Sequence, residues 1–136
     1  MAEYNKPLPN MNGDSKEFWA GCKEHELKFQ KCKTCGHVRW PASIICPMCH
    51  SKETKWIVAR GKGKVHTFAV YHVAYDPAFE KDLPYVVADV ELEEGPRLVT
   101  NIVGCRPDEV RCEMLVEVTW EDITEDFSLP KFRPCC

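Results

Sequence analysis

The sequence lacks the features that define several broad protein classes. No run approaches the roughly 20 apolar residues of a membrane-spanning helix, and Met1–Lys6 has no apolar core, so we expect no signal peptide. It has no internal repeat, low-complexity segment, P-loop or dinucleotide-binding fingerprint. It also lacks an excess of basic charge, with 18 Lys and Arg against 21 Asp and Glu. That balance weakens a non-specific nucleic-acid function, which needs a basic face.

Cysteine, by contrast, is abundant in these 136 residues, and four of the nine cysteines form two Cys-x-x-Cys pairs. Cys32 and Cys35 make the first pair, and Cys46 and Cys49 the second. Each tight turn brings two thiolates to one ion, so the two pairs complete the tetrahedral sulfur shell that suits Zn²⁺. Four protein ligands leave no open position, so we predict a structural zinc. Gly36 follows the first pair, where such a turn needs a positive φ.

Other interpretations of these cysteines are weaker. Disulfides, buried free thiols or a redox pair would each explain one Cys-x-x-Cys, but a redox motif should open a helix after a strand. Nine cysteines could suggest a secreted disulfide scaffold, but the lack of a signal peptide and the zinc-type spacing indicate a reducing cytoplasm. We therefore expect a cytoplasmic protein.

The length suggests one domain or two small units that share a core. We predict four segments: an arm and helix in 1–27, a zinc ribbon in 28–53, a barrel in 54–121 and a tail in 122–136. The overall fold class is mainly β, with an N-terminal helix, a rubredoxin-like four-cysteine ribbon and a five-stranded OB-type barrel.

The first segment begins with an irregular arm over residues 1–13, which is rich in Pro, Asn and Gly. Asp14 is a good N-cap, with Glu17 completing a capping-box pattern, and the helix should run over about 15–26. Its apolar stripe either covers the domain's own core or docks on a partner subunit. The stripe contains Phe18, Trp19, Cys22, His25 and Phe29.

The alternation of strands and turns predicts the rest of the fold. Short strands over 28–31 and 37–40 flank the first cysteine pair, which is the plan of a zinc ribbon. Five later β segments, with one helical turn over 107–110, favour an OB barrel over an SH3-like one. These segments are 54–59, 64–72, 85–92, 97–103 and 115–120.

Several short motifs, taken in order, resemble one family over residues 14–134. They are Phe18-Trp19, Pro41, Cys46-Pro47, Trp56, Gly61-x-Gly63, Pro84-Tyr85, Glu94–Arg97, Val116–Val118 and Leu129-Pro130-x-Phe132. This order is similar to zinc-ribbon/OB proteins of the "domain of unknown function 35" (DUF35) family. One departure is the linker Pro41-Ala42-Ser43, where the family usually has Pro-Pro-Arg.

The resemblance implies an accessory subunit that docks on a thiolase-fold enzyme and helps form its acyl-CoA site. One branch is the small subunit of benzoylsuccinyl-CoA thiolase in anaerobic aromatic degradation, and this short chain is compatible with it. Phe18 and Trp19 would then dock on the partner. We expect no catalytic residue in the chain itself, because none of its spare cysteines has an evident activating neighbour.

Coenzyme A would be a ligand shared with that partner, and its phosphates require Lys or Arg. Candidates for CoA or partner contacts are Arg60, Lys62, Lys64, Tyr75, Phe79, Lys131, Phe132 and Arg133. The alternative function is a single-stranded nucleic-acid binder that uses Trp56, Phe68 and Tyr71 for stacking.

Overall fold

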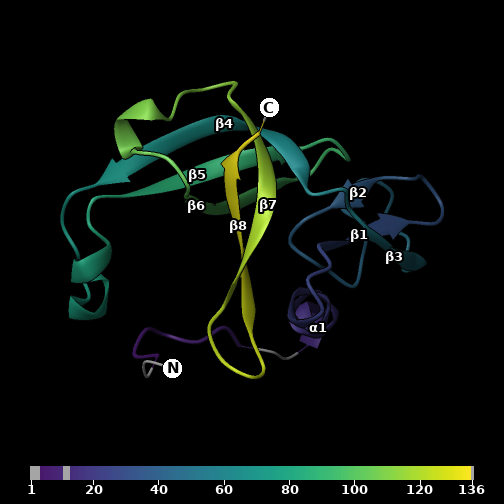
Figure 1. Ribbon diagram of the computed structural model, residues 1–136. Coiled ribbons are helices and arrows are strands. Elements are labelled where there is room, and N and C mark those ends of the chain that lie inside the picture. Colours follow the sequence, from purple (N-terminus) through teal and green to yellow (C-terminus); the bar gives the residue numbers. More distant parts are fainter. Residues whose placement is uncertain (1–3, 11–12, 136) are drawn as a thin grey trace.

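The computed structural model describes residues 4–10 and 13–135, which form a three-stranded ribbon, one α-helix and a closed five-stranded barrel (Figure 1). The first residues of the expected arm, its Asn12, and Cys136 lie outside the described residues. None of the helices in the described part has the length and apolar character needed to cross a membrane.

The N-terminal helix is shorter than the sequence pattern predicted. A 3-10 turn, η1 (Gly13–Ser15), precedes α1 (Lys16–Lys23), and the N-cap is Ser15 rather than Asp14. The helix ends early because His25 has a φ of 59°. The amides of His25 and Glu26 then bond back to the last turn of α1, which closes it in a Schellman-type arrangement.

The ribbon sheet consists of β1 (Lys28–Cys32), β2 (Val38–Arg39) and β3 (Thr54–Val58), in the order β2-β1-β3. We had predicted the 54–59 strand as the first strand of the barrel, and this assignment is wrong. β3 pairs antiparallel with β1 along its whole length, from Lys28 opposite Val58 to Cys32 opposite Thr54. The strand therefore belongs to the ribbon.

The barrel closes in the order β4-β5-β6-β8-β7, and β7 returns to pair with β4. β6 and β8 run parallel, with Ile102 opposite Phe132, while the other neighbours are antiparallel. This is the OB topology. The strands are β4 (Lys62–Tyr71), β5 (Tyr85–Leu92), β6 (Arg97–Ile102), β7 (Leu115–Asp122) and β8 (Ser128–Pro134); 3-10 turns are η2 (Pro77–Asp82) and η3 (Pro107–Glu109).

The fifth barrel strand lies in the segment that we had predicted to be a tail. β8 pairs with β7 over seven residue positions and buries Phe132 completely. Pro130 and Pro134 weakened the strand signal in the sequence, because proline cannot donate to a ladder. The expectation of a tail over 122–136 is therefore wrong for the β8 residues.

One apolar core joins the helix, the ribbon and the barrel. Phe18 of α1 and Phe29 of β1 are as buried as Val90 and Phe132 inside the barrel, and they belong to the same cluster. The strictly alternating burial along β5 shows the inward and outward faces of the sheet. The ribbon is thus packed firmly against the barrel by shared core residues.

Candidate functional site

The four cysteines of the ribbon converge at one point. Their Sγ atoms all lie within 4.8 Å of one another, and Cys32–Cys49 and Cys35–Cys46 are each separated by 3.6 Å. A tetrahedral shell with Zn–S bonds of about 2.3 Å has edges of about 3.8 Å. The thiol positions therefore fit a four-coordinate structural zinc, as the sequence predicted.

The two cysteine turns have the same local geometry. The amides of Gly36 and His50 donate to the carbonyls of Cys32 and Cys46, at 2.9 and 2.8 Å. Both residues have a positive φ, 80° for Gly36 and 64° for His50. The prediction for Gly36 is confirmed, and His50 holds the equivalent position at some cost in backbone strain.

The turns also prepare a thiol for metal binding. The backbone amide of Cys35 donates to Cys32 Sγ at 3.5 Å and, with the Thr34 amide, lowers the pKa of Cys32, whereas burial and the other three thiols raise the pKa of Cys49. A metal must displace the protons of its thiol ligands, so a lowered pKa favours coordination near neutral pH.

The linker between the two turns is held by Arg39, which the sequence reasoning overlooked. This buried guanidinium donates to the Ser43 hydroxyl and carbonyl at 3.1 and 2.9 Å, and to the Thr54 hydroxyl at 2.8 Å. Gln30 accepts from the Ser43 amide at 2.8 Å. Ser43, the last position of the family's Pro-Pro-Arg linker motif, thus receives hydrogen bonds from an arginine on β2.

The basic residues at the start of β4 lie on the outer surface of the barrel, where carboxylates surround them. Arg60 Nη1 is 3.6 Å from Glu93, and Lys64 Nζ is 3.0 Å from Glu113. Most of their positive charge is therefore balanced within the chain.

Lys62 and Arg133 are brought to the same row of the sheet. Glu117 of β7 lies opposite Lys62 on one side and Arg133 on the other, and Arg133 Nε donates to it at 3.1 Å. Within the described residues, Lys62 is in no ion pair. Its side chain is exposed, so it is the cation of this group that is available to an external anion.

The glycines on either side of Lys62 allow β4 to approach its neighbouring strands closely enough for the barrel to close. A Cβ on Gly61 would lie 2.3 Å from Val118 Cγ1, and one on Gly63 would lie 2.3 Å from the Glu91 carbonyl oxygen. Only glycine permits these strand approaches. The Gly-x-Gly pattern is therefore explained by packing and supplies no evidence for a phosphate-binding loop.

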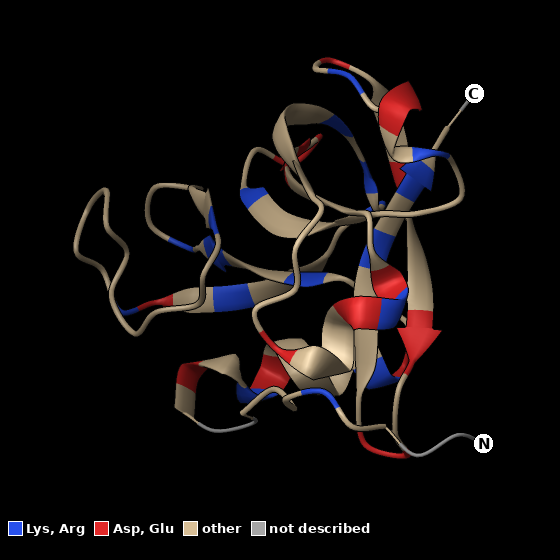
Figure 2. Ribbon diagram, turned by 90° about the vertical axis from the view of Figure 1, so that its left-hand side faces the viewer, with Lys and Arg blue, Asp and Glu red and all other residues tan. Residues whose placement is uncertain are grey.

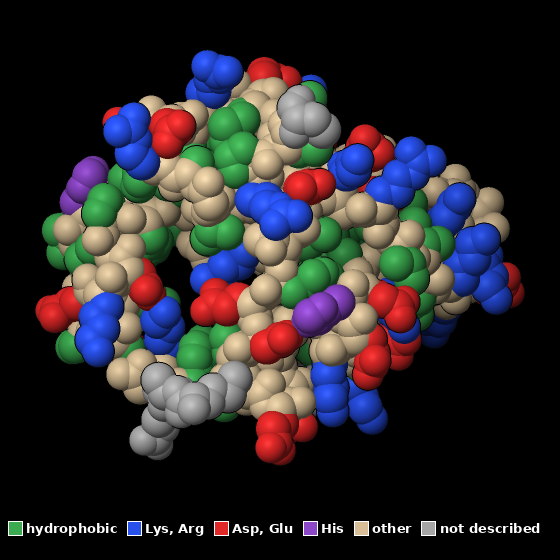
Figure 3. Space-filling view, viewed as in Figure 1, with side chains coloured by type: hydrophobic (Ala, Val, Ile, Leu, Met, Phe, Trp, Pro, Cys, Tyr) green, Lys and Arg blue, Asp and Glu red, His purple; other side chains and the backbone are tan. Residues whose placement is uncertain are grey.

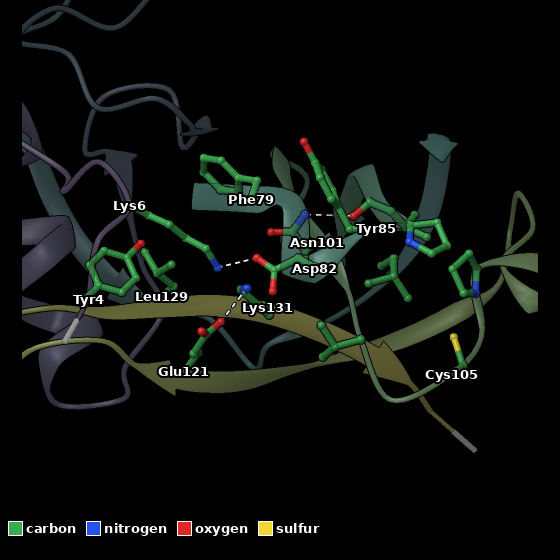
Figure 4. A pocket seen from close by; sticks show the side chains of 15 residues that line it. Tyr4, Lys6, Phe79, Asp82, Tyr85, Asn101, Cys105, Glu121, Leu129 and Lys131 are labelled. Atoms are coloured by element: carbon green, nitrogen blue, oxygen red, sulfur yellow. Dashed lines mark hydrogen bonds and ion pairs between the residues drawn. The ribbon is translucent and has the colours of Figure 1, made fainter. Parts of the chain in front are cut away.

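A pocket of about 300 Å³ lies on the outside of the barrel, between η2 and the β7–β8 hairpin. Figure 4 shows it from close by, and Figure 3 shows a hollow bordered by charged side chains at this place. Its position between the β4–β5 and β7–β8 loops is where OB folds commonly bind ligands. It is lined by Tyr4, Lys6, Phe79, Asp82, Pro84, Tyr85, Val86, Asn101, Ile102, Val103, Cys105, Pro107, Glu121, Leu129 and Lys131.

Two ion pairs lie in the pocket, one between its walls and one along the β7–β8 hairpin. Lys6 of the N-terminal arm pairs with Asp82, and Lys131 of β8 pairs with Glu121 of β7 (Figure 4). The hydrogen bond to Asp82 raises the pKa of Lys6, which also lies 5.3 Å from the Phe79 ring centre. The arm is thus held against the barrel of its own chain, a contact that no sequence pattern predicted.

The pocket can bind a ligand, but its lining offers little for catalysis. Cys105 is the only thiol among its described lining residues, and burial followed by the nearby charge of Glu109 raises the pKa of that group. No histidine lines the pocket, so none of its described lining residues is a base suited to activating a thiol.

The remaining residues that we predicted to contact CoA or a partner do not form one site. Phe79 and Lys131 line the pocket, whereas the Tyr75 side chain is 91% exposed on the preceding loop. Phe132 is completely buried in the barrel, so it cannot contact CoA or a partner.

The two aromatic residues predicted to dock on a partner have different environments. Phe18 is buried, with its ring centre 4.2 Å from that of Trp40, so it serves the chain's own core. Trp19 is half-buried and packs edge-to-face on Phe127 at 6.1 Å. Of this pair, Trp19 alone presents part of its surface to solvent.

Together the fold and the four-cysteine site define a zinc-ribbon/OB-fold protein, and comparison with known proteins specifies its family. Residues 19–54 match the rubredoxin-like zinc ribbon domain of ChsH2, and residues 56–121 match its C-terminal OB-fold domain. A DUF35 domain-containing scaffold protein of Methanocaldococcus jannaschii is 48% identical over 97 residues, which are 71% of this chain and 68% of the relative. The chain belongs to the DUF35 family.

Other relatives are subunits of larger enzymes. A probable enoyl-CoA hydratase alpha subunit of Thermomonospora curvata is 40% identical over 95% of this chain, which spans only 40% of that relative. The benzoylsuccinyl-CoA thiolase subunit BbsA of Thauera aromatica is 28% identical over 68% of this chain and 62% of the subunit. A solved chain of the Ltp2-ChsH2(DUF35) aldolase is 40% identical, with a TM-score of 0.85 and coverages of 93% and 98%.

Proposed function

We propose that this chain is a non-catalytic accessory subunit of a thiolase-type acyl-CoA C-acyltransferase, acting in the cytoplasm. It docks on the catalytic subunit and helps to form the acyl-CoA site. The observation that carries the proposal is the extended similarity to proteins described as scaffolds and as subunits of CoA enzymes.

The geometry of the chain supports a role without chemistry. Its zinc site is closed by four sulfur ligands, so it has no position for substrate. The described lining of the barrel pocket includes a thiol but no histidine. Such a subunit contributes binding energy and positioning to a reaction performed by its partner.

Acyl-CoA would be shared across the interface between the two subunits. Lys62 and Arg133, on either side of Glu117, are the candidates on this chain for the CoA phosphates. Phe79 and Lys131 at the pocket are candidates for the rest of the ligand or for the partner.

The experiment that tests this function uses the chain alone and together with a thiolase-fold subunit from the same genome. We expect the purified chain to show no thiolysis of acetoacetyl-CoA, and the two proteins to co-elute and to show activity together. Thiolysis by the chain alone would overturn the non-catalytic role, and failure to form a complex would overturn the accessory role. In the complex, Lys62→Ala should raise KM for acyl-CoA and leave kcat unchanged, with Lys16→Ala on α1 as control.

Single-stranded nucleic acid is the less favoured ligand. The pocket at the usual OB binding position contains the carboxylates of Asp82 and Glu121, and both are paired with lysines. A nucleic-acid groove instead needs unpaired positive charge beside stacking aromatic rings.

A further inference from the structure

The zinc ribbon carries positive charge that the chain does not balance. Residues 28–58 contain six Lys and Arg and one acidic residue, whereas the whole chain has a net charge of −3. Arg39 is buried, and Lys28 pairs with Glu17 at 3.0 Å. Within the described residues, the other four lysines are in no ion pair: Lys31, Lys33, Lys52 and Lys55.

The barrel behaves differently. Arg60, Lys64, Lys131 and Arg133 each lie within ion-pair distance of a carboxylate. Figure 2 shows Lys and Arg segments beside Asp and Glu segments on the barrel strands, and Figure 3 shows Lys and Arg side chains gathered at the ribbon end. Lys62, Arg97 and Arg111 are also in no ion pair within the described residues, but outside residues 28–58 the chain has 12 Lys and Arg against 20 Asp and Glu. The excess of positive over negative charge is therefore a local property of the ribbon.

Two of the unpaired lysines are fixed next to each other. Lys31 of β1 lies directly opposite Lys55 of β3, on the same face of the sheet. Like charges in this relation destabilise a sheet. Lys33 follows two residues after Lys31, and its amide extends the β1–β3 pairing by donating to the Glu53 carbonyl at 2.9 Å. This arrangement costs stability in the isolated chain and becomes favourable when a negatively charged surface covers it.

Large apolar side chains are exposed on the same end of the ribbon. Ile44, Ile45 and Met48 are 66%, 45% and 69% exposed, around the second cysteine turn. The two turns are joined by the Thr34–Ser51 hydrogen bond of 2.9 Å and by the Cys32–Cys49 Sγ separation of 3.6 Å. Lys33, next to Cys32, and Met48, next to Cys49, are therefore carried by turns that meet at the same point. We name these seven residues the ribbon tip: Lys31, Lys33, Ile44, Ile45, Met48, Lys52 and Lys55.

An apolar centre beside charged residues is the composition of a protein interface. We propose that the ribbon tip docks on an acidic protein surface with an apolar centre. The identity of that partner, the catalytic subunit, rests on the proposed function. A nucleic acid is less suited to the ribbon tip, since none of its seven side chains is aromatic and none can stack on a base.

The first test compares lysine acetylation in the free chain and in its complex with the thiolase-fold subunit. We expect Lys31, Lys33, Lys52 and Lys55 to be protected in the complex, whereas Lys16 on α1 stays reactive. A complex in which the four ribbon lysines react as fast as in the free chain would overturn the docking surface and leave the accessory function intact.

Charge reversal provides the second test. The double variant Lys31→Glu/Lys55→Glu replaces one like-charge pair with another, so its fold and zinc content should be unchanged. It should weaken the complex by about tenfold, largely through slower association. The matched control, Lys16→Glu/Lys81→Glu, reverses two exposed lysines outside the ribbon and should have little effect. Equal affinities of the two double variants would overturn the proposal.

A third test remains decisive if the thiolase-fold subunit does not bind, which would refute the proposed function alone. Here the probes are a random glutamate–tyrosine copolymer and single-stranded oligothymidylate, each followed by the amide NMR shifts of the full chain. We expect the copolymer to shift ribbon-tip signals in the native chain and not in Lys31→Glu/Lys55→Glu. Absence of that shift, or tighter binding of the oligonucleotide at the ribbon tip, would overturn the inference.

Discussion

His25 and Asp122 join the end of α1 to the end of β7, with His25 Nε2 2.7 Å from Asp122 Oδ1 across 97 positions of the sequence. The His25 ring also stacks on Trp120, with centroids 5.3 Å apart and an interplanar angle of 1°. The positive φ that ends the helix turns this side chain toward the barrel. One residue thus both terminates the helix and attaches it to the β7–β8 hairpin.

This contact predicts a pH-dependent stability. The hydrogen bond from His25 holds the pKa of Asp122 below its usual value. Such a carboxylate stabilises the fold above its unfolded-state pKa of about 3.9, and the contribution is lost as the pH falls through the lower folded-state value. Asp122→Asn should therefore be less stable than the native chain at neutral pH, with the difference disappearing in acid.

Urea unfolding at a series of pH values measures this difference. Asp126→Asn is the matched control, because Asp126 lies on the same hairpin but is highly exposed and 4.0 Å from Lys23. It should change stability little at any pH. A stability difference for Asp122→Asn that persists unchanged below the pKa of the carboxylate would contradict the prediction.

Removal of zinc should affect the ribbon before the barrel. Without a common ion, nothing would hold the four cysteine sulfurs at one point, and the two turns could separate although Arg39 still bonds to the linker. We expect chelation to reduce the near-ultraviolet circular dichroism from Trp40 and Trp56, and to dissociate the complex. Zinc analysis should give one ion per native chain, and less in Cys46→Ser. Chelation that abolishes turnover in an intact complex would instead indicate a direct role of the metal.

The two cysteine turns should respond differently to substitution. Gly36→Ala places a side chain at a φ of 80° and should lower stability by about 1–2 kcal/mol. His50→Gly relieves the same strain at 64° but adds freedom to the unfolded chain, so its net effect should be within about 0.5 kcal/mol. Guanidinium unfolding of the zinc-loaded proteins measures both, and equal losses in the two variants would refute this account.

The barrel closure at Gly61 is also testable. Gly61→Ala introduces both backbone strain and a clash with Val118, and should cost about 2–4 kcal/mol. Gly95→Ala is the control, because φ there is 114° but no atom lies within 4 Å of the added Cβ. Val118→Ala should recover part of the loss at Gly61 and nothing at Gly95. Equal losses in both glycine variants, measured by thermal unfolding, would exclude the clash.

Local sequence patterns predicted the ribbon and the positive φ at Gly36, because ligand spacing and turn geometry depend on a few adjacent residues. The barrel was predicted as a class, but its strands were misassigned at both ends. β3 could pair with the ribbon or the barrel, and the choice depends on its register with Lys28–Cys32. β8 was missed because Pro130 and Pro134 obscure its alternation, although Phe132 fills the core.

The sequence by itself determined that this chain has a four-cysteine zinc ribbon, a mainly β fold and no excess of positive charge. Those properties follow from residue type and spacing. Only the tertiary structure decided that Lys6 meets Asp82 across the pocket, that Phe132 is unavailable to ligands, and that Lys31 faces Lys55. Each of these three findings depends on strand register or on contacts between distant segments. No short stretch of sequence encodes register or long-range contacts.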